Sequence, residues 1–502
     1  MSSSKDKEYS NLFDTSQITR VVGQKSAKAG AANLASQGLS LVITLLRAAI
    51  LARLLTPADY GVFAMVVVVS SFATIFKDLG LSTATIREKK ITHAQVSNLF
   101  WINFLVGIVS MMVVWSAAPL MVWFYREPQL AAIARVLSMA FLFSGLSVQH
   151  QALLKRQMQF GKIAIITVGA SLASSLLGIW IAYIRGNYWA LVWMQIAQNC
   201  FLMVGFWVAT HWIPSLPLRK VGTKKFIKTG VDVAGLNAFS TLTQSVDKIL
   251  AGRLAGATNL GLYNKGGQIP NLVSGQFRMA FFSVALPALS SLQSENERFA
   301  SYYQTFLFAI CWVTMSLSVF CFVFAEEIIG VYFGPQWVGS VPFMRIFTLH
   351  AFLMPSITTL DQIPLALGYS RRYLAGGIVR SIGTIFCVGA GAAVYGVRGI
   401  ALGVVLANLV TFFPFSRICL KNSPVRLSAY FQTALIPLLI TLIIGLIFWI
   451  GKFFCPVTNL SLKMFIMTAC MLTFCTAFLF CDYFSVGGSM GAARKIINML
   501  HR

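Results

Sequence analysis

Residues 429–450 have the sequence AYFQTALIPLLITLIIGLIFWI, which contains no charged side chain. About 20 predominantly apolar residues are enough to cross the hydrocarbon core of a bilayer as an α-helix. A strand of a membrane barrel is shorter than this stretch and alternates between apolar and polar residues, whereas this stretch shows no such alternation. We therefore predict a transmembrane helix here, and the rest of the chain repeats its character.

Thirteen further segments are long and apolar enough to span a membrane. They lie at residues 31–54, 60–80, 96–124, 130–152, 161–184, 188–209, 229–252, 260–287, 302–325, 341–366, 373–394, 397–416 and 462–482. Of the 502 residues 57% are hydrophobic and 11% charged, whereas a soluble domain has about 25% charged residues. This composition excludes a soluble domain, a disordered chain and a nucleic-acid-binding module, although the net charge is +25. We expect an all-α polytopic membrane protein with about 14 transmembrane helices.

The basic residues indicate the orientation of these helices. If the N-terminus is cytoplasmic, 25 of the 40 Lys and Arg residues fall in cytoplasmic tails and loops and seven on the opposite side. Short loops rich in Lys and Arg remain on the cytoplasmic side of a membrane. The chain is therefore predicted to have both termini in the cytoplasm.

An internal repeat divides the chain into two halves. Residues 47–63 (RAAILARLLTPADYGVF) align without gaps with residues 247–263 (DKILAGRLAGATNLGLY), and each copy opens a set of six spans. An even number of spans gives both copies the same orientation, so we expect parallel repeats with a site between them. The predicted parts are a tail (1–30), an N-lobe of helices 1–6 (31–225), a C-lobe of helices 7–12 (226–425), helices 13 and 14 (426–485) and a second tail (486–502).

The first helix of each half carries a polar stripe at helical spacing. The stripe residues are Gln37, Ser40 and Thr44 in the first span, and Asn237, Ser240, Thr241 and Gln244 in the seventh. A helix that faces lipid does not carry such a stripe, so both stripes must face protein or water. We interpret them as the walls of a hydrated cavity; the alternative is polar contact between packed helices.

Eight basic residues remain within or at the edge of the spans, against four acidic ones. Lys77 lies near a helix end, where its side chain can reach the membrane surface. The other seven, predicted to make a cationic cavity, are Arg47, Arg135, Lys248, Lys265, Arg278, Arg345 and Arg380. A buried charge in a bilayer is costly, so a cationic surplus indicates that an anion such as phosphate or carboxylate binds there.

The acidic residues of the spans are candidates for coupling to a cation. They are Asp232, Asp247 and Asp361, besides Asp78 next to Lys77. His350 is interpreted as a polar residue whose hydrogen bonds are satisfied. Pro355 and Pro364 flank Asp361 in the tenth span and are expected to kink it. The nine cysteines show no metal-ligand spacing, so we expect neither a metal site nor a cofactor.

Several strings of residues resemble those of one family. They are 51–61 (LARLLTPADYG), 77–81 (KDLGL), 245–254 (SVDKILAGRL), 260–265 (LGLYNK) and 286–290 (LPALS). In combination they resemble the polysaccharide-export flippases (Wzx and WzxC-like proteins) of the multidrug/oligosaccharidyl-lipid/polysaccharide exporter superfamily, over about residues 25–480.

The resemblance implies two six-helix lobes in a V around a central cavity, in the bacterial inner membrane. It implies transport of undecaprenyl-diphosphate-linked oligosaccharide between leaflets, coupled to a proton or sodium ion, with glycosyltransferases or a polymerase of the same pathway as partners. One departure concerns the eleventh span, which carries Arg380 and no acidic residue. The sodium-site carboxylate of some related flippases therefore has no counterpart there.

Three alternatives stay open at this stage. A peptidoglycan-precursor lipid flippase fits the same pattern. A cation-coupled drug antiporter on the same fold would have a cavity dominated by acids. A membrane-embedded glycosyltransferase or polymerase would need a catalytic acid or base at the membrane surface, for which Glu326 and Glu327 are the external acidic cluster. We expect a transporter rather than an enzyme.

Overall fold

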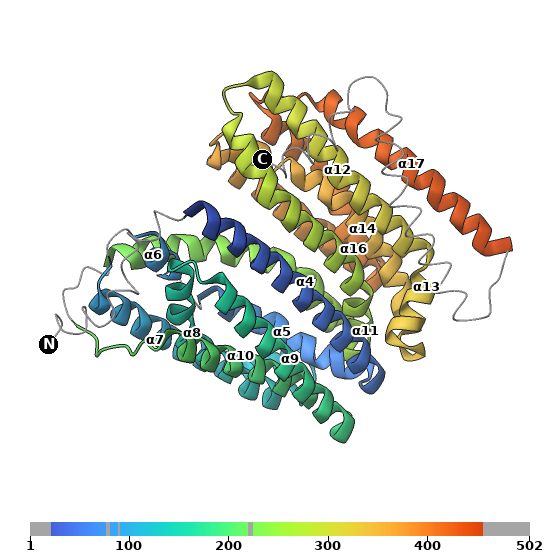
Figure 1. Cartoon of the computed structure of the whole chain (residues 1–502). Helices are drawn as coiled ribbons and strands as arrows, with labels where there is room; N and C mark the ends of the chain where they lie inside the picture. Colours follow the sequence, from blue (N-terminus) through green and yellow to red (C-terminus); the bar gives the residue numbers. More distant parts are fainter. Residues whose placement is uncertain (1–21, 77–80, 89–90, 219–223, 455–502) are drawn as a thin grey trace. The chain divides into compact units, whose positions relative to one another are not determined.

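The computed structural model describes residues 22–76, 81–88, 91–218 and 224–454, and within these ranges every regular element is a helix. In unit order the helices are α4 (Val22–Leu54), α5 (Pro57–Phe76), α6 (Leu81–Arg87), α7 (His93–Tyr125), α8 (Leu130–Arg156), α9 (Phe160–Arg185), α10 (Trp189–Thr210), α11 (Lys224–Ser291), α12 (Asn296–Val323), α13 (Ala325–Ile328), η1 (Ile329–Phe333), η2 (Pro335–Ser340), α14 (Val341–Thr359), α15 (Gln362–Ala366), α16 (Ser370–Leu420) and α17 (Leu427–Phe454). Figure 1 shows them along the chain. The predicted all-α polytopic class is confirmed.

Ten helical segments of the described residues are long and apolar enough to cross a membrane. One of these, 370–420, contains the two spans expected at 373–394 and 397–416, and another, 243–291, contains the span expected at 260–287 and the end of the one expected at 229–252. The span expected at 60–80 corresponds to α5, whose apolar part is Pro57–Ser71. The span expected at 462–482 and the tail 486–502 lie outside the described residues, as does most of the tail 1–30; α4 already begins at Val22.

Two glycines divide the long helices at the points where the sequence predicts a connection. The backbone leaves the helical conformation at Gly256 in α11, with φ of 74°, and at Gly396 in α16, with φ of 57°. Positive φ is readily adopted by glycine because it has no Cβ. Each long element is thus two helical arms joined by a single glycine, and the break at Gly256 falls 200 residues after the break between α4 and α5.

The first compact unit ends at Gly261. In it α7 packs on α8, α10 packs on α8 and α9, and α4 packs on α9. One of its apolar cores joins α4, α9 and α10 through Leu51, Leu55, Ala182, Ala190, Leu191 and Met194. This unit therefore includes the helices of the predicted N-lobe together with the first arm of α11.

Residues 211–218, which follow α10, run alongside the start of α7 and are held there by side chains. The Asn98 amide donates to the Leu218 carbonyl oxygen at 2.7 Å and accepts from the Leu218 N–H at 2.9 Å. Trp101 Nε1 donates to the Ser215 carbonyl oxygen at 2.8 Å. Side chains of α7 thus satisfy backbone groups of a segment that has no secondary structure of its own.

The second compact unit begins at Leu262. Here α12 packs against α14 and α17, and α16 packs against α14 and α15; Figure 1 shows α17 alongside α12. Its apolar core includes Leu289, Phe299, Tyr303, Leu307, Cys311, Met315, Leu360 and Phe415. The predicted division between lobes at residue 225 follows the sequence repeat and remains a prediction, because compactness alone divides the chain 36 residues later.

Candidate functional site: a buried charge cluster in the second unit

An ion pair lies inside the second unit. Arg380 Nη1 is 2.8 Å from Asp361 Oδ2, and the two side chains are only 21% and 16% exposed. The guanidinium carbon of Arg380 also lies 5.2 Å from the centre of the Phe415 ring, and its Nη2 lies 3.6 Å from Met354 Sδ. The pair is therefore enclosed by apolar and polarisable groups, where a charge interaction is screened far less than in water.

The local backbone explains how Asp361 comes to lie in the interior. The helix expected at 341–366 is interrupted between α14 and α15, where Leu360 and Asp361 form a turn with i to i+3 hydrogen bonds. Pro355 and Pro364 stand on either side, as the sequence predicts for a kinked span. A proline removes one hydrogen bond from the helix ladder, which allows this tightening.

Two further groups complete the cluster. His350, on α14, lies with its Nδ1 2.8 Å from Asn408 Nδ2 on the second arm of α16. Arg278, on α11, adds a second positive charge that acts on His350 and Asp361, while the ion pair of Asp361 among the described residues is with Arg380. The carboxylate of Asp361 thus pairs with Arg380, and the imidazole of His350 has a partner for its Nδ1, as the sequence predicts for His350.

The structure brings two of the residues predicted from sequence into contact, namely Arg380 and Asp361. The sequence analysis did not identify Asn408, which contacts His350, or Met354 and Phe415, which contact Arg380. Asn408 could have been noticed as an isolated amide in the apolar span 397–416. Nothing in the sequence indicates that Met354 or Phe415 would contact the arginine, since both are ordinary residues of apolar helices.

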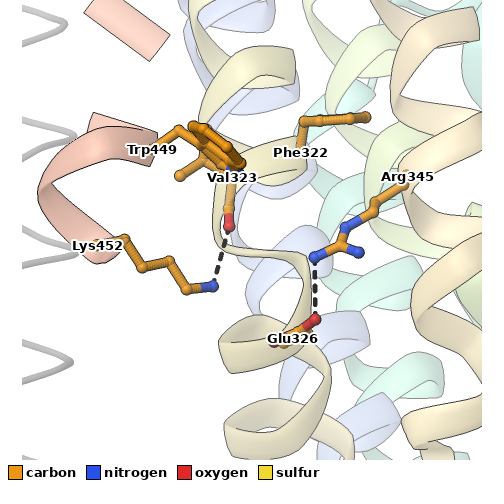
Figure 2. A pocket seen from close by; sticks show the side chains of 6 residues that line it. All are labelled: Phe322, Val323, Glu326, Arg345, Trp449 and Lys452. Carbon is orange, nitrogen blue, oxygen red and sulfur yellow. Dashed lines mark hydrogen bonds and ion pairs between the residues drawn. The ribbon is translucent and has the colours of Figure 1, made fainter. Parts of the chain in front are cut away.

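Arg345 lies in a different part of the second unit. Its guanidinium is 3.0 Å from Glu326, and Lys452 is 2.8 Å from Glu327. Arg345 and Lys452 line a hollow of about 490 Å³ together with Phe322, Val323, Glu326 and Trp449. Figure 2 shows these six side chains. Two bases are matched by two acids here, so this hollow has no cationic surplus.

Lys265 is enclosed by the core of the second unit and is 3% exposed. Its ammonium lies 4.6 Å from the centre of the Phe333 ring and 5.4 Å from that of Trp337. Such cation–π contacts stabilise a buried ammonium. A ligand cannot reach Lys265 in this conformation without displacing these rings.

The remaining predicted residues lie in the first unit. Arg47, Ser40, Thr44, Thr241, Asp247 and Lys248 are half-buried, and Gln37 and Gln244 are exposed. Arg135 is exposed, with its guanidinium 5.8 Å from the centre of the Trp115 ring. The side chains of Asp232, Asn237 and Ser240 lie outside the described residues. The cavity role of all these residues remains a prediction.

Comparison with known proteins gives the family. Residues 50–342 match the family described as polysaccharide biosynthesis protein. Teichuronic acid biosynthesis protein TuaB of Bacillus subtilis is 23% identical over 81% of this chain and 84% of that protein. Lipopolysaccharide biosynthesis protein WzxC of Escherichia coli is 21% identical over 79% of this chain and 80% of that protein.

Among solved structures, lipid II flippase MurJ in an inward closed conformation superposes with a TM-score of 0.70. It is 14% identical and the match covers 89% of this chain and 98% of that chain. At this identity the likeness shows the fold alone. With the family match over more than half of the chain, the resemblance to polysaccharide flippases is confirmed, and the chain belongs to the polysaccharide biosynthesis protein family of multi-pass membrane transport proteins.

Proposed function

We propose that the protein moves a polyprenyl-diphosphate-linked oligosaccharide from the inner to the outer leaflet of the bacterial inner membrane. The observation that carries this proposal is the buried ion pair of Arg380 with Asp361 inside the second unit, with Arg278 as a second basic residue whose charge acts on the same carboxylate. Guanidinium groups bind phosphate oxygens in a planar, paired geometry. The names of the relatives TuaB and WzxC, both biosynthesis proteins of surface polysaccharides, support a sugar-bearing cargo.

In the mechanism we infer, Asp361 neutralises Arg380 while the site is empty. An incoming diphosphate competes for Arg380 and recruits Arg278, and it displaces the carboxylate. The displaced carboxylate then needs a proton or a sodium ion, which links substrate binding to an ion gradient. The polar stripes of the first and seventh spans contact the sugars, and the prenyl tail remains in the lipid. The site becomes accessible to the two sides of the membrane in turn, and no covalent step is required.

The charge balance separates this proposal from the drug antiporter and the enzyme. A cation-coupled antiporter needs a site in which acids exceed bases, whereas this cluster holds two guanidinium groups for one carboxylate. For a glycosyltransferase, Glu326 and Glu327 would have to be available as catalytic acid or base. Both are engaged by Arg345 and Lys452.

A peptidoglycan-precursor flippase is the second candidate, because the sequence pattern fits it equally well. Both cargoes carry the same diphosphate, so the charge cluster suits either. The distinction therefore has to come from the sugar, and it can be made in cells by complementation.

The experiment introduces the gene into one bacterial strain that lacks its polysaccharide flippase and into another depleted of its lipid II flippase. We expect surface polysaccharide to return in the first strain only. Arg380→Ala and Arg278→Ala should each reduce export at least about tenfold, because each removes a charge-assisted contact to the diphosphate. Arg298→Ala is the matched control, since Arg298 pairs with Glu295 at 2.8 Å on the exposed surface. Rescue of the second strain alone would contradict the proposal.

A further inference from the structure

The two copies of the internal repeat touch each other through two residues in each copy, the second of which is a glycine. Pro57 and Gly61 are four residues apart at the start of α5, and Ala257 and Gly261 occupy the same positions, 200 residues later, at the start of the second arm of α11. A glycine, which has no side chain, lets the backbone of a neighbouring helix approach closely.

The contact is reciprocal. A Cβ added to Gly61 would lie 1.7 Å from the Ala257 carbonyl oxygen, and one added to Gly261 would lie 1.9 Å from the Pro57 carbonyl oxygen. Position 61 of the first copy meets position 257 of the second, and position 261 meets position 57. This exchange is what a two-fold axis between the copies produces, and it agrees with the parallel orientation expected for the repeat.

Both contacting segments, the start of α5 and the start of the second arm of α11, lie directly after a break in the helix. The start of α5 is fixed by hydrogen bonds. Thr56 N and Oγ1 donate to Asp59 Oδ2 at 2.9 and 2.6 Å, which fixes the start of α5. Asp59 Oδ1 also accepts from the N–H of Tyr188, ahead of α10, at 2.9 Å. On the other side, Gly256 gives the chain its turn, and Gly261 is the last residue before the second compact unit.

The chemistry of the contact suits a surface that opens and closes. Backbone carbonyl oxygens meet glycine Cα atoms, so the contact consists of dispersion and weak Cα–H···O interactions. The carbonyls of Pro57 and Ala257 stand in the first turns of helices, so parting the surfaces breaks no side-chain hydrogen bond at Gly61 or Gly261. By the distribution of basic residues, both motifs lie at the end of their helices predicted to be external.

We propose that the contact of Gly61 and Gly261 with Ala257 and Pro57 is the external closure of the transporter, which parts when the site opens to the outside. The proposal rests on the proposed transport function. It requires glycine at both positions. Ordinary van der Waals contact begins at 3.4 Å, whereas a methyl carbon would lie 1.7 Å from the Ala257 carbonyl oxygen at Gly61 and 1.9 Å from the Pro57 carbonyl oxygen at Gly261.

The test measures closure without any substrate. A single reporter cysteine replaces Thr44, of the predicted polar stripe, in a version without the native cysteines, and a membrane-impermeant maleimide is applied from outside. Gly61→Ala and Gly261→Ala should each raise the labelling rate at least about fivefold, which corresponds to a shift of about 1 kcal/mol in a two-state equilibrium. Gly169→Ala is the matched control, because a Cβ at this glycine of α9 meets nothing within 4 Å.

The double variant adds a second criterion. If both glycines belong to one contact surface, either substitution alone separates that surface and removes both contacts. The double variant should therefore label little faster than either single variant. Thermal unfolding of each variant establishes that it is folded. Labelling at the wild-type rate in folded Gly61→Ala and Gly261→Ala proteins would overturn the proposal. If the glycine variants label faster but the unaltered chain, with Thr44, Gly61 and Gly261 in place, moves no lipid-linked oligosaccharide in vesicles, the closure stands and the transport function is rejected.

Discussion

Replacing Asp361 by asparagine should leave Arg380 as an uncompensated charge inside the second unit. The two side chains are 2.8 Å apart and 21% and 16% exposed. Removing one partner of a buried ion pair costs about 3–5 kcal/mol, because the remaining charge has lost both water and its counter-charge. Asparagine can still accept a hydrogen bond, so we expect a loss near the lower end, about 3 kcal/mol of unfolding free energy.

The chain provides a matched control for this substitution. Arg298 and Glu295 form an ion pair of the same length, 2.8 Å, but their side chains are 75% and 47% exposed. Exposed pairs contribute about 0–1 kcal/mol. Glu295→Gln should therefore change stability by less than about 1 kcal/mol, and the difference between the two variants isolates the effect of burial.

The assay is equilibrium unfolding in detergent, with and without inorganic pyrophosphate. In Asp361→Asn the freed guanidinium can bind the diphosphate, which should restore about 2.7 kcal/mol at a concentration one hundred times its dissociation constant. Glu295→Gln should gain no more than the wild type does. If Asp361→Asn were as stable as Glu295→Gln, or if pyrophosphate left it unchanged, Asp361 would not be the counter-charge of an anion site.

Other predictions concern the first unit. Asn98→Ala removes two hydrogen bonds to Leu218, worth about 1 kcal/mol each, so limited proteolysis within residues 211–218 should become at least about tenfold faster; an unchanged rate would mean that α7 does not hold this segment. Arg47→Glu and Lys248→Glu should abolish polysaccharide export with normal amounts of protein in the membrane, while Arg298→Glu should retain it. Full export in both reversals would remove the first unit from the cationic cavity.

The helices were predictable because hydrophobic length is a local property of the sequence. The spans at 130–152, 161–184 and 188–209 correspond closely to α8, α9 and α10. The connections expected between spans 7 and 8, and between spans 11 and 12, proved to be single glycines. The sequence locates such a turn but does not show that the helix resumes at once, because this depends on one positive φ angle.

The candidate site was predictable only in part, because charge counting does not assign partners. The surplus of bases pointed to Arg380, which the structure pairs with Asp361, and to Arg278, whose role in the site remains a prediction. It treated Arg345 in the same way, although an acid from α13 lies 3.0 Å away. It also could not foresee that two rings enclose Lys265. These differences arise from tertiary packing, which brings together residues far apart in the chain.

The central claim is transport of a diphosphate-linked oligosaccharide, and reconstitution tests it most directly. Purified protein is incorporated into vesicles with a polyprenyl-diphosphate-linked oligosaccharide in the inner leaflet, and appearance of the sugar outside is followed with an impermeant lectin. We predict appearance that depends on the protein, falls at least about tenfold in Arg380→Ala, and exceeds that of lipid II in matched vesicles. Equal appearance in protein-free vesicles, or transport of lipid II alone, would contradict the account.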